Sequence, residues 1–403
     1  MKLAIDVSRA GARGRTGIGW YTVHLVNALK DVIPDTVGVV LYSDRELPDD
    51  LLPLPDHWKV EVLPWPGVRG RSKRDNPSDS QLSTFNFQLS KRWPLWSQVR
   101  LAWQVLRDRP DVLFIPAHVI PLALAWKRRL QNLFPISRLV GGRGGVGMRI
   151  VTTIHDVVFK DFPETYSPRE RRYANFATGL ALRCADSVIV PTRSVANDLA
   201  RYYGTPRAQI VAIHHGVDSI YFSIGNRPVG KLLLYAGRIE NKKNTERLVE
   251  AFEQVADIDT EVQLVLVGSD GFGSESTHAR VRRSRHARRI RMPGWVSTDA
   301  YRNLLGIASA FVFPTLGEGF GLPILEAMAA GVPVITSRGG VHEEIAGDAA
   351  ILVDPLDVDA IARGMHEILR KENALRLSEC GRARARQFSW SSCAEQTWSV
   401  LQK

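Results

Sequence analysis

A glycine-rich stretch in the last third of the chain combines groups that suit phosphate with groups that suit hydroxyls. Glu318 and Glu326 are separated by seven residues, and Gly319 and Gly321 lie between them. A helix is expected to begin at Pro323, since proline suits the first helical position, and this places Glu326 in the first turn. Free N–H groups of the loop and of the helix start suit an anion. The two acids are expected at opposite ends of a hydroxylated ligand with a central diphosphate.

Two cations follow a predicted strand that runs from Leu232 to Ala236. They are Arg238 and Lys243, just before a predicted helix. A guanidinium group can bind two phosphate oxygens, and an ammonium group adds a point charge. These two residues are therefore predicted to bind a diphosphate, with Lys242 as an alternative to Lys243. The other interpretation is a pair of surface cations on a loop.

The first half of the chain offers another glycine-rich turn and a histidine at a strand end. Gly17 and Gly19 lie at the start of a helix expected from Ile18 to Lys30, and their spacing does not match the G-x-G-x-x-G dinucleotide pattern. His155 follows a strand expected from Arg149 to Ile154, at the edge where parallel α/β sheets bind ligands. An isolated histidine in this place is more often structural.

Several stretches resemble the retaining glycosyltransferases of family GT4. The stretch EGFGLPILEAMAAGVPVI resembles the signature of that family. Other family motifs are resembled by TGIGWY, TIHDVVFKDFPE and GRIENKKN. Trp20 and His215 depart from the pattern, because arginine and asparagine are usual at their positions. The resemblance implies an α/β chain with the GT-B fold, in which two Rossmann-like domains face each other across a cleft.

The resemblance also implies roles for individual residues. Arg238 and Lys243 would neutralise the departing diphosphate, and Glu326 would hold the ribose hydroxyls. His155 and Glu318 would contact the transferred sugar as the catalytic residues. No metal ion or other cofactor is then needed, and a donor phosphate oxygen takes the acceptor proton; Glu318 as a covalent nucleophile is less favoured. The expected donor-binding residues are Gly17, Gly19, Arg238, Lys243, Gly268, Val296, Gly319, Phe320, Gly321, Leu322 and Glu326.

The alternation of strands and helices predicts two α/β domains. A Rossmann-like acceptor-side domain is expected over residues 1–217, with a basic, tryptophan-rich insertion at about 64–148. A linker over 218–230 would lead to a nucleotide-sugar-binding domain over 231–387. The terminal helix over 388–403 is expected to cross back to the first domain.

The net charge of +11 is concentrated in this insertion, where fourteen basic residues face four acidic ones. A helix from about Trp96 to Arg107 would place Val99, Trp103 and Leu106 on one side. Mixed aromatic and basic character suits an anionic membrane surface. The alternative is a core-packed helical insertion beside a loop.

Other features of the composition narrow the class of protein. A second arginine cluster, from Arg280 to Arg291, fits solvated surface charge and an anionic partner about equally. Cys184, Cys380 and Cys393 suggest neither a disulfide framework nor a zinc site. The first residues read as a strand and not as a signal peptide, and no apolar run is long enough to span a bilayer. We expect a cytoplasmic protein, peripheral at the inner face of the cytoplasmic membrane, with no nucleic-acid partner.

The whole pattern looks most like bacterial mannosyltransferases of polysaccharide assembly. It favours transfer of a hexose, with mannose from GDP-mannose preferred, from a nucleotide-sugar donor to a lipid-linked or saccharide acceptor. A sugar-nucleotide epimerase or a phosphorylase would share the GT-B fold. A non-enzymatic basic protein that binds membrane or nucleic acid would explain the charge but not the spacing of the acids and cations.

Overall fold

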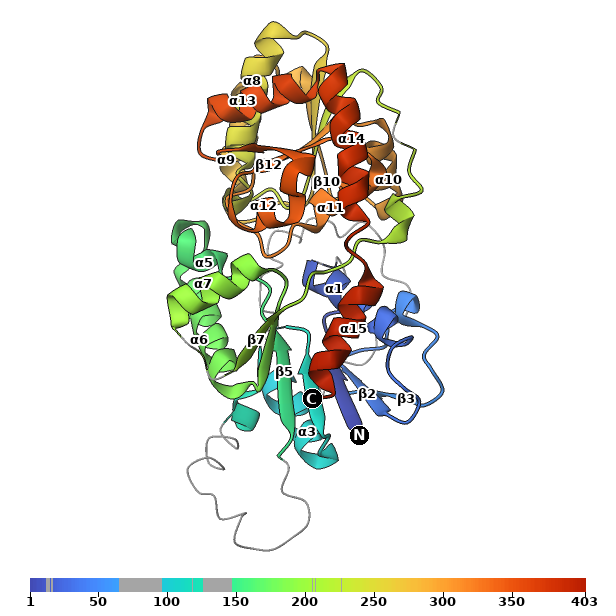
Figure 1. Cartoon of the computed structure of the whole chain (residues 1–403). Coiled ribbons are helices and arrows are strands. Elements are labelled where there is room, and N and C mark those ends of the chain that lie inside the picture. Colours follow the sequence, from blue (N-terminus) through green and yellow to red (C-terminus); the bar gives the residue numbers. More distant parts are fainter. Residues whose placement is uncertain are drawn as a thin grey trace, which may run out of the picture.

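A computed structural model describes residues 1–11, 15, 17–64, 96–117, 119–125, 147–204, 206, 208–225 and 227–403. Most of the basic insertion, including residues 65–95 and 126–146, lies outside this range. The chain forms two α/β domains, and Figure 1 shows the second domain above the first. In the described residues no helix is long and apolar enough to cross a membrane.

The first domain is built on a parallel sheet that has seven strands in the described residues. Its spatial order is β3-β2-β1-β4-β5-β6-β7. The strands are β1 (Lys2–Asp6), β2 (Gly38–Ser43), β3 (Trp58–Val62), β4 (Val112–Ile115), β5 (Arg149–Thr153), β6 (Ser187–Val190) and β7 (Gln209–Ala212). The helices are α1 (Gly17–Leu29), α3 (Ala102–Asp108), α5 (Val158–Asp161), α6 (Pro168–Cys184) and α7 (Arg193–Tyr203).

The second domain repeats this plan on a parallel sheet with six strands in the described part of the chain. Its spatial order is β10-β9-β8-β11-β12-β13. The strands are β8 (Lys231–Ala236), β9 (Val262–Val267), β10 (Ile290–Gly294), β11 (Ala310–Phe313), β12 (Val334–Ser337) and β13 (Ala350–Val353). The helices are α8 (Thr245–Ile258), α9 (Ser274–Arg283), α10 (Thr298–Ile307), α11 (Leu322–Ala330), α12 (Gly340–Ala346), α13 (Val358–Ile368) and α14 (Lys371–Ala385).

Both faces of the first sheet are covered in its centre, which is why strands β1, β2, β4 and β6 are almost fully buried, whereas β3 and β7 at the two edges are more exposed. Leu3 and Ile5 of β1 pack with the core of α1 and the terminal helix α15 (Trp390–Leu401). Ala4, between them, packs with the core on the other face, where α6 and α7 lie. Because the strands of each sheet are parallel, their carboxyl ends share one edge, and the segments that follow β1, β5, β8, β9, β10 and β11 carry the predicted site residues.

The chain crosses between the domains twice, and the two crossings are tied together. After β7 it passes upward through Val217, and after α14 it returns through Phe388 into α15, which packs on α1. The N–H of Val217 donates to the carbonyl of Phe388 at 3.2 Å. Gly216 lies against the backbone of Trp390, and a Cβ at position 216 would be only 2.2 Å from its nitrogen.

This contact predicts that Gly216→Ala destabilises the protein. The added methyl group would meet backbone atoms at the double crossing, so we expect the free energy of unfolding to fall by about 1–3 kcal/mol. Urea denaturation followed by circular dichroism measures the change. Gly225→Ala is the control, because its Cβ would have nothing within 4 Å. Equal midpoints for the two variants would contradict the prediction.

Candidate active site

The glycine-rich loop after β11 runs directly into α11. Gly321 precedes the helix with φ of 88°, a left-handed conformation that glycine adopts without strain. The helix therefore begins at Leu322, one residue before the predicted start at Pro323. Glu326 consequently lies in the second helical turn, so its predicted place in the first turn was wrong. All four residues of β11, which leads into the loop, are buried.

The loop after β11 is joined to the loop after β8 by backbone and side chain. The N–H of Leu316 donates to the carbonyl of Lys242 at 2.9 Å. Lys243 forms an ion pair with Glu318, and both side chains are 14% exposed. The predicted acid and the predicted cation are therefore in direct contact with each other. If Lys243 binds a diphosphate, as predicted, its ion pair with Glu318 has to break.

A buried acid that the sequence analysis did not single out organises the cations. Glu240 is 7% exposed and lies 3.5 Å from Arg238 and 3.7 Å from Lys242, measured between charged atoms. Burial would raise the pKa of Glu240, but Lys242, Lys243 and Arg238 together lower it. Glu240 thus remains a carboxylate, pairs with Arg238 and Lys242, and is stabilised by the charge of Lys243 as well. The stretch GRIENKKN contains this acid, so its position inside a basic motif was the available signal.

The first domain approaches this cation group closely. The Nζ atom of Lys242 lies 3.3 Å from the hydroxyl oxygen of Tyr166 and 5.3 Å from the centre of its ring. A Cβ at Gly319 would be 1.9 Å from the carbonyl oxygen of His155. Only a glycine fits this approach, because any side chain would push the loops of the two domains apart. The predicted residues His155 and Gly319 therefore meet across the domain boundary.

His155 is held in one neutral form. Its Nε2 atom lies 3.0 Å from the carbonyl oxygen of Pro116, and because a carbonyl only accepts, Nε2 carries the proton. Burial lowers the pKa of His155, although the Pro116 carbonyl and Asp156 act in the opposite direction. The other ring nitrogen, Nδ1, is left as a hydrogen-bond acceptor. This arrangement suits contact with a sugar hydroxyl.

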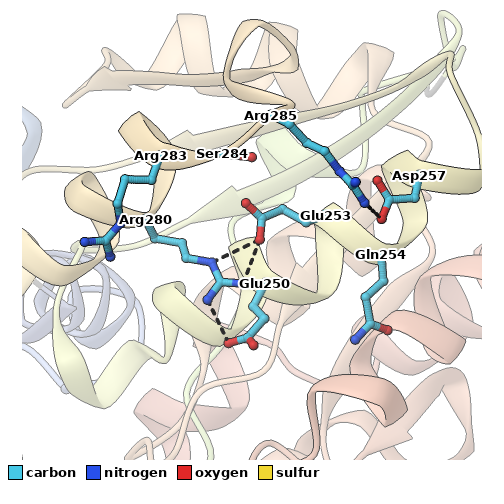
Figure 2. Close-up of a pocket in the computed structure, with 8 residues that line it drawn as sticks. All are labelled: Glu250, Glu253, Gln254, Asp257, Arg280, Arg283, Ser284 and Arg285. Carbon is cyan, nitrogen blue, oxygen red and sulfur yellow. Dashed lines mark hydrogen bonds and ion pairs between the residues drawn. The ribbon is translucent and has the colours of Figure 1, made fainter.

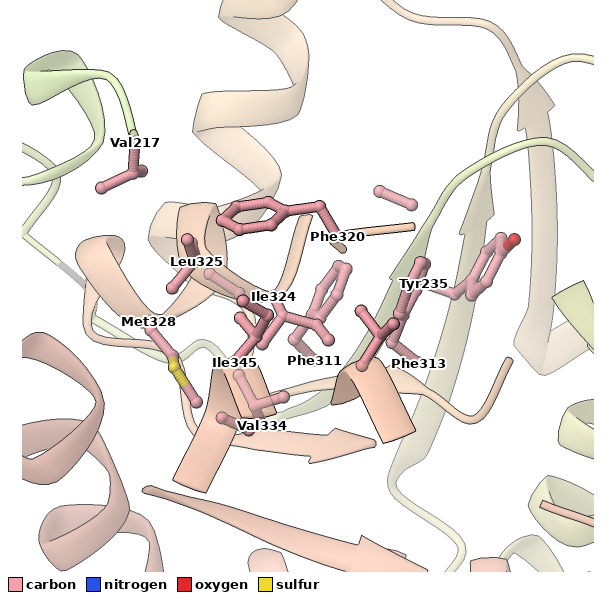
Figure 3. Packing of buried hydrophobic residues seen from close by; sticks show 14 of the residues in the cluster. Val217, Tyr235, Phe311, Phe313, Phe320, Ile324, Leu325, Met328, Val334 and Ile345 are labelled. Atoms are coloured by element: carbon pink, nitrogen blue, oxygen red, sulfur yellow. The ribbon is translucent and has the colours of Figure 1, made fainter. Parts of the chain in front are cut away.

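An aromatic cluster beside His155 joins three parts of the chain. His215 lies 4.4 Å from Tyr21 of α1 and 4.5 Å from Phe320 of the loop after β11, measured between ring centres. Its distance to Trp390 of α15 is 5.8 Å. Within the described residues neither ring nitrogen of His215 has a hydrogen-bond partner, and burial lowers its pKa well below the usual value. His215 therefore acts as a neutral aromatic spacer. Figure 3 shows Phe320 lying over Ile324 and Leu325 of α11.

Glu344 of α12 is a second functional candidate without a local sequence signal. Its carboxylate accepts the N–H groups of Arg193 and Ser194, at the start of α7 in the first domain, each at 2.8 Å. It also lies 2.8 Å from Nε2 of His214. An acid at a helix N-terminus is favourable, and this acid comes from the other domain. Glu344 thus fixes the relative position of the two domains beside the cation group.

Glu326 of α11 is buried among tyrosine side chains. It lies between Tyr221 and Tyr301, whose ring centres are 6.2 Å apart. Burial raises the pKa of Glu326 to about 7, although the two tyrosine hydroxyls lower it in part. Glu318 and Glu326 are therefore in different surroundings: the first is paired with Lys243, and the second has no cation among the groups that shift its pKa.

The other predicted donor-binding residues lie along the cleft edges of both sheets. Gly19 approaches the carbonyl oxygen of Arg9 so closely that a Cβ would be 2.9 Å from it. Gly268 follows β9, and a Cβ added at this position would be 1.9 Å from the carbonyl oxygen of Gly237. The remaining ones are Gly17 and Leu322, which start α1 and α11, and Val296, which follows β10. The guanidinium of Arg15 lies 4.9 Å from the ring centre of Trp20, the residue that replaces the usual arginine.

The second arginine cluster lies away from this site, in an open hollow between α8 and α9 (Figure 2). Arg280 pairs with Glu253 at 2.7 Å and with Glu250 at 3.3 Å, and Arg285 pairs with Asp257. These carboxylates neutralise the cations that face them. The hollow therefore fits solvated, ion-paired surface better than an anion site. In the described part of the chain no group of three His, Cys, Asp or Glu side chains is placed to hold a metal ion.

Comparison with known proteins agrees with this geometry. The family model "Glycosyltransferase Family 4" matches residues 16–219, and the model "Glycosyl transferases group 1" matches residues 218–384. The chain is 32% identical over 348 residues to O-antigen chain mannosyltransferase B of Escherichia coli, covering 80% of this chain and 84% of that one. It is 28% identical over 274 residues to the MMP alpha-(1->4)-mannosyltransferase of Mycolicibacterium hassiacum, covering 64% and 66%.

Solved structures show the same fold. Sucrose-phosphate synthase from Thermosynechococcus elongatus superposes with a TM-score of 0.73 at 20% identity, covering 100% of this chain and 98% of that one. This likeness confirms the predicted GT-B arrangement of two α/β domains. Since family models match both halves and one relative is 32% identical over most of its length, the chain belongs to glycosyltransferase family 4.

Proposed function

We propose that this glycosyltransferase transfers a hexose from a nucleotide sugar to a lipid-linked or saccharide acceptor, with retention of anomeric configuration. The observation that carries the proposal is the cation group of Arg238, Lys242 and Lys243: Glu240 pairs with the first two, and Glu318 of the loop after β11 pairs with the third. Three cations at a sheet edge suit a diphosphate. Gly319 of the same loop lies against the carbonyl of His155 in the first domain, and we propose that His155 contacts the sugar.

Mannose, and GDP-mannose as its donor, are the preferred choices. The relative that is 32% identical is an O-antigen chain mannosyltransferase, and the second is also a mannosyltransferase. Both relatives are named for the transfer of mannose, which supports mannose as the sugar transferred by this chain. The family members' acceptors differ, so the acceptor is proposed only by class, as a saccharide that either is free or is attached to a lipid.

The cations explain how the bond to the leaving group would break without a metal ion. Negative charge builds up on the departing diphosphate in an oxocarbenium-like transition state, and fixed cations stabilise it directly. Lys243 would leave Glu318 for the diphosphate, which frees Glu318 to hold sugar hydroxyls. His155 would accept a hydrogen bond from the sugar through Nδ1. A donor phosphate oxygen would take the acceptor proton, so no protein base is assigned.

Removing one cation tests this proposal. Arg238→Ala is expected to weaken binding of the true donor at least about tenfold, because a charge-assisted hydrogen bond to phosphate is lost. Calorimetry with a panel of nucleotide sugars, in the presence of EDTA, measures the affinity and identifies the base and the sugar.

Arg363→Ala is the matched control, since Arg363 is 69% exposed and pairs with Asp357 on the surface. Unchanged donor binding by Arg238→Ala, or donor binding only when a divalent metal is added, would contradict the cation mechanism. Turnover of donor without acceptor, or a requirement for inorganic phosphate, would favour an epimerase or a phosphorylase.

The pKa of about 7 at Glu326 predicts that donor affinity depends on pH. As a carboxylate, Glu326 accepts hydrogen bonds from both ribose hydroxyls, whereas the protonated acid accepts fewer. The dissociation constant is therefore expected to decrease about five- to tenfold as the pH rises from about 6 to about 8. Calorimetry across this range measures it. Glu326→Gln should bind more weakly and without this dependence; a slope that persists in the variant would assign it to another group.

A further inference from the structure

A small apolar groove opens on the first domain, outside the cleft. It has a volume of about 100 Å³ and lies between the turn at 119–122, the segment that begins at Trp96, and α6. Apolar side chains provide almost all of its lining. The lining residues are Gln98, Val119, Ile120, Leu122, Tyr173, Phe176, Ala177 and Leu180. The amide of Gln98 accepts the N–H of Leu122 at 2.6 Å and so joins two of the three walls.

Large apolar side chains around this groove are left in solvent. Phe176 is 51% exposed and Leu122 is 39% exposed. Next to Gln98, the chain forms a π-helix (Trp96–Leu101) followed by α3, and here Val99 is 52% and Trp103 is 57% exposed. The predicted helix is thus confirmed as two consecutive helical segments, and Val99 and Trp103 of its predicted apolar side face outward, whereas Leu106 is half-buried. We call Val99, Trp103, Leu122 and Phe176 the apolar face.

The segment that carries Val99 and Trp103 is anchored from behind. Trp96 is 2% exposed, and its Nε1–H donates to the carbonyl of Leu63 at 2.7 Å. Leu101 is fully buried in the core under the sheet. The exposure of Val99 and Trp103 is therefore fixed by the packing of their neighbours, and a rotation of the helix that hid them would expose Trp96 and Leu101.

Three exposed arginines lie on the helices that carry Trp103 and Phe176 of the apolar face. Arg169 and Arg172 are exposed on α6, and they precede Phe176 by seven and four residues, so all three share one side of the helix. The guanidinium of Arg107 lies 5.5 Å from the ring centre of Trp103. Apolar side chains flanked by arginines suit the boundary between anionic headgroups and acyl chains.

The groove is also close in sequence to the residue that holds His155. Pro116, whose carbonyl oxygen is 3.0 Å from Nε2 of His155, is only three residues before Val119 of the groove. Tyr173 lines the groove, and the charge of Arg9, at the cleft edge of β1, lowers its pKa although burial raises it overall. A surface bound here would hold an acceptor near the cleft without blocking the second domain.

We propose that the apolar face and its arginines dock the first domain on an anionic membrane surface. This inference rests on the proposed function, since it gives a reason why a lipid-linked acceptor would reach the cleft. Val99, Trp103, Leu122 and Phe176 enter the interface between headgroups and acyl chains, while Arg107, Arg169 and Arg172 contact lipid phosphates. The apolar part of this binding persists at high salt, and the arginine part weakens.

Vesicle sedimentation of the full chain tests the docking surface. The probe is a vesicle of phosphatidylcholine with about 30% phosphatidylglycerol, compared with phosphatidylcholine alone. The double variant Trp103→Ser and Phe176→Ser is expected to lose at least about tenfold in partition to the anionic vesicle. The matched control is Ile258→Ser with Leu375→Ser, which removes side chains that are 77% and 59% exposed in the second domain and should leave partition unchanged.

Each outcome decides the inference. No vesicle binding by the unmodified protein, or equal binding by both double variants, would overturn it. A fall in thermal stability of the first variant without loss of vesicle binding would mean that another part of this chain covers the apolar face, and would also overturn it. Calorimetry with nucleotide sugars on the same variants keeps the two proposals separate, because docking can fail while donor binding persists.

Discussion

The active cleft depends on one group of opposite charges at the carboxyl edge of the second sheet. Glu240 is buried, yet three cations keep it ionised, and two of them, Arg238 and Lys242, pair with its carboxylate. Removing a partner from such a buried group leaves an uncompensated charge, which costs about 3–5 kcal/mol. The loops after β8 and β11 are therefore set by electrostatics as much as by packing. The same cations are the ones available to an incoming diphosphate.

The second domain alone does not complete the cleft. His155, Tyr166 and the start of α7 come from the first domain, and they meet Gly319, Lys242 and Glu344 of the second. These contacts join a glycine to a carbonyl, a cation to a phenol and a carboxylate to a helix N-terminus. The last of them is a pair of 2.8 Å hydrogen bonds, and the second joins two atoms 3.3 Å apart. A rotation that separated the domains here would break these contacts together.

Much of this arrangement followed from local sequence. Strands, the glycine-rich loop and the Arg238 to Lys243 spacing are local patterns, and they predicted the sheet edges on which the site residues lie. The pairing of Lys243 with Glu318 joins residues far apart in sequence, and no pattern encodes it. Glu344 is one acid among many until its partner helix is known. The raised pKa of Glu326 likewise comes from Tyr221 and Tyr301, which reach it from other elements.

The return of α15 to the first domain makes the second domain an insertion between β7 and α15. Both ends of the chain lie in the first domain, as Figure 1 shows. The two segments that connect the domains are hydrogen-bonded to each other where Val217 meets Phe388. The second domain is therefore attached to the first through two adjacent backbone segments and not through one flexible linker. Any change in the angle between the two domains would therefore have to bend the backbone at both crossings together.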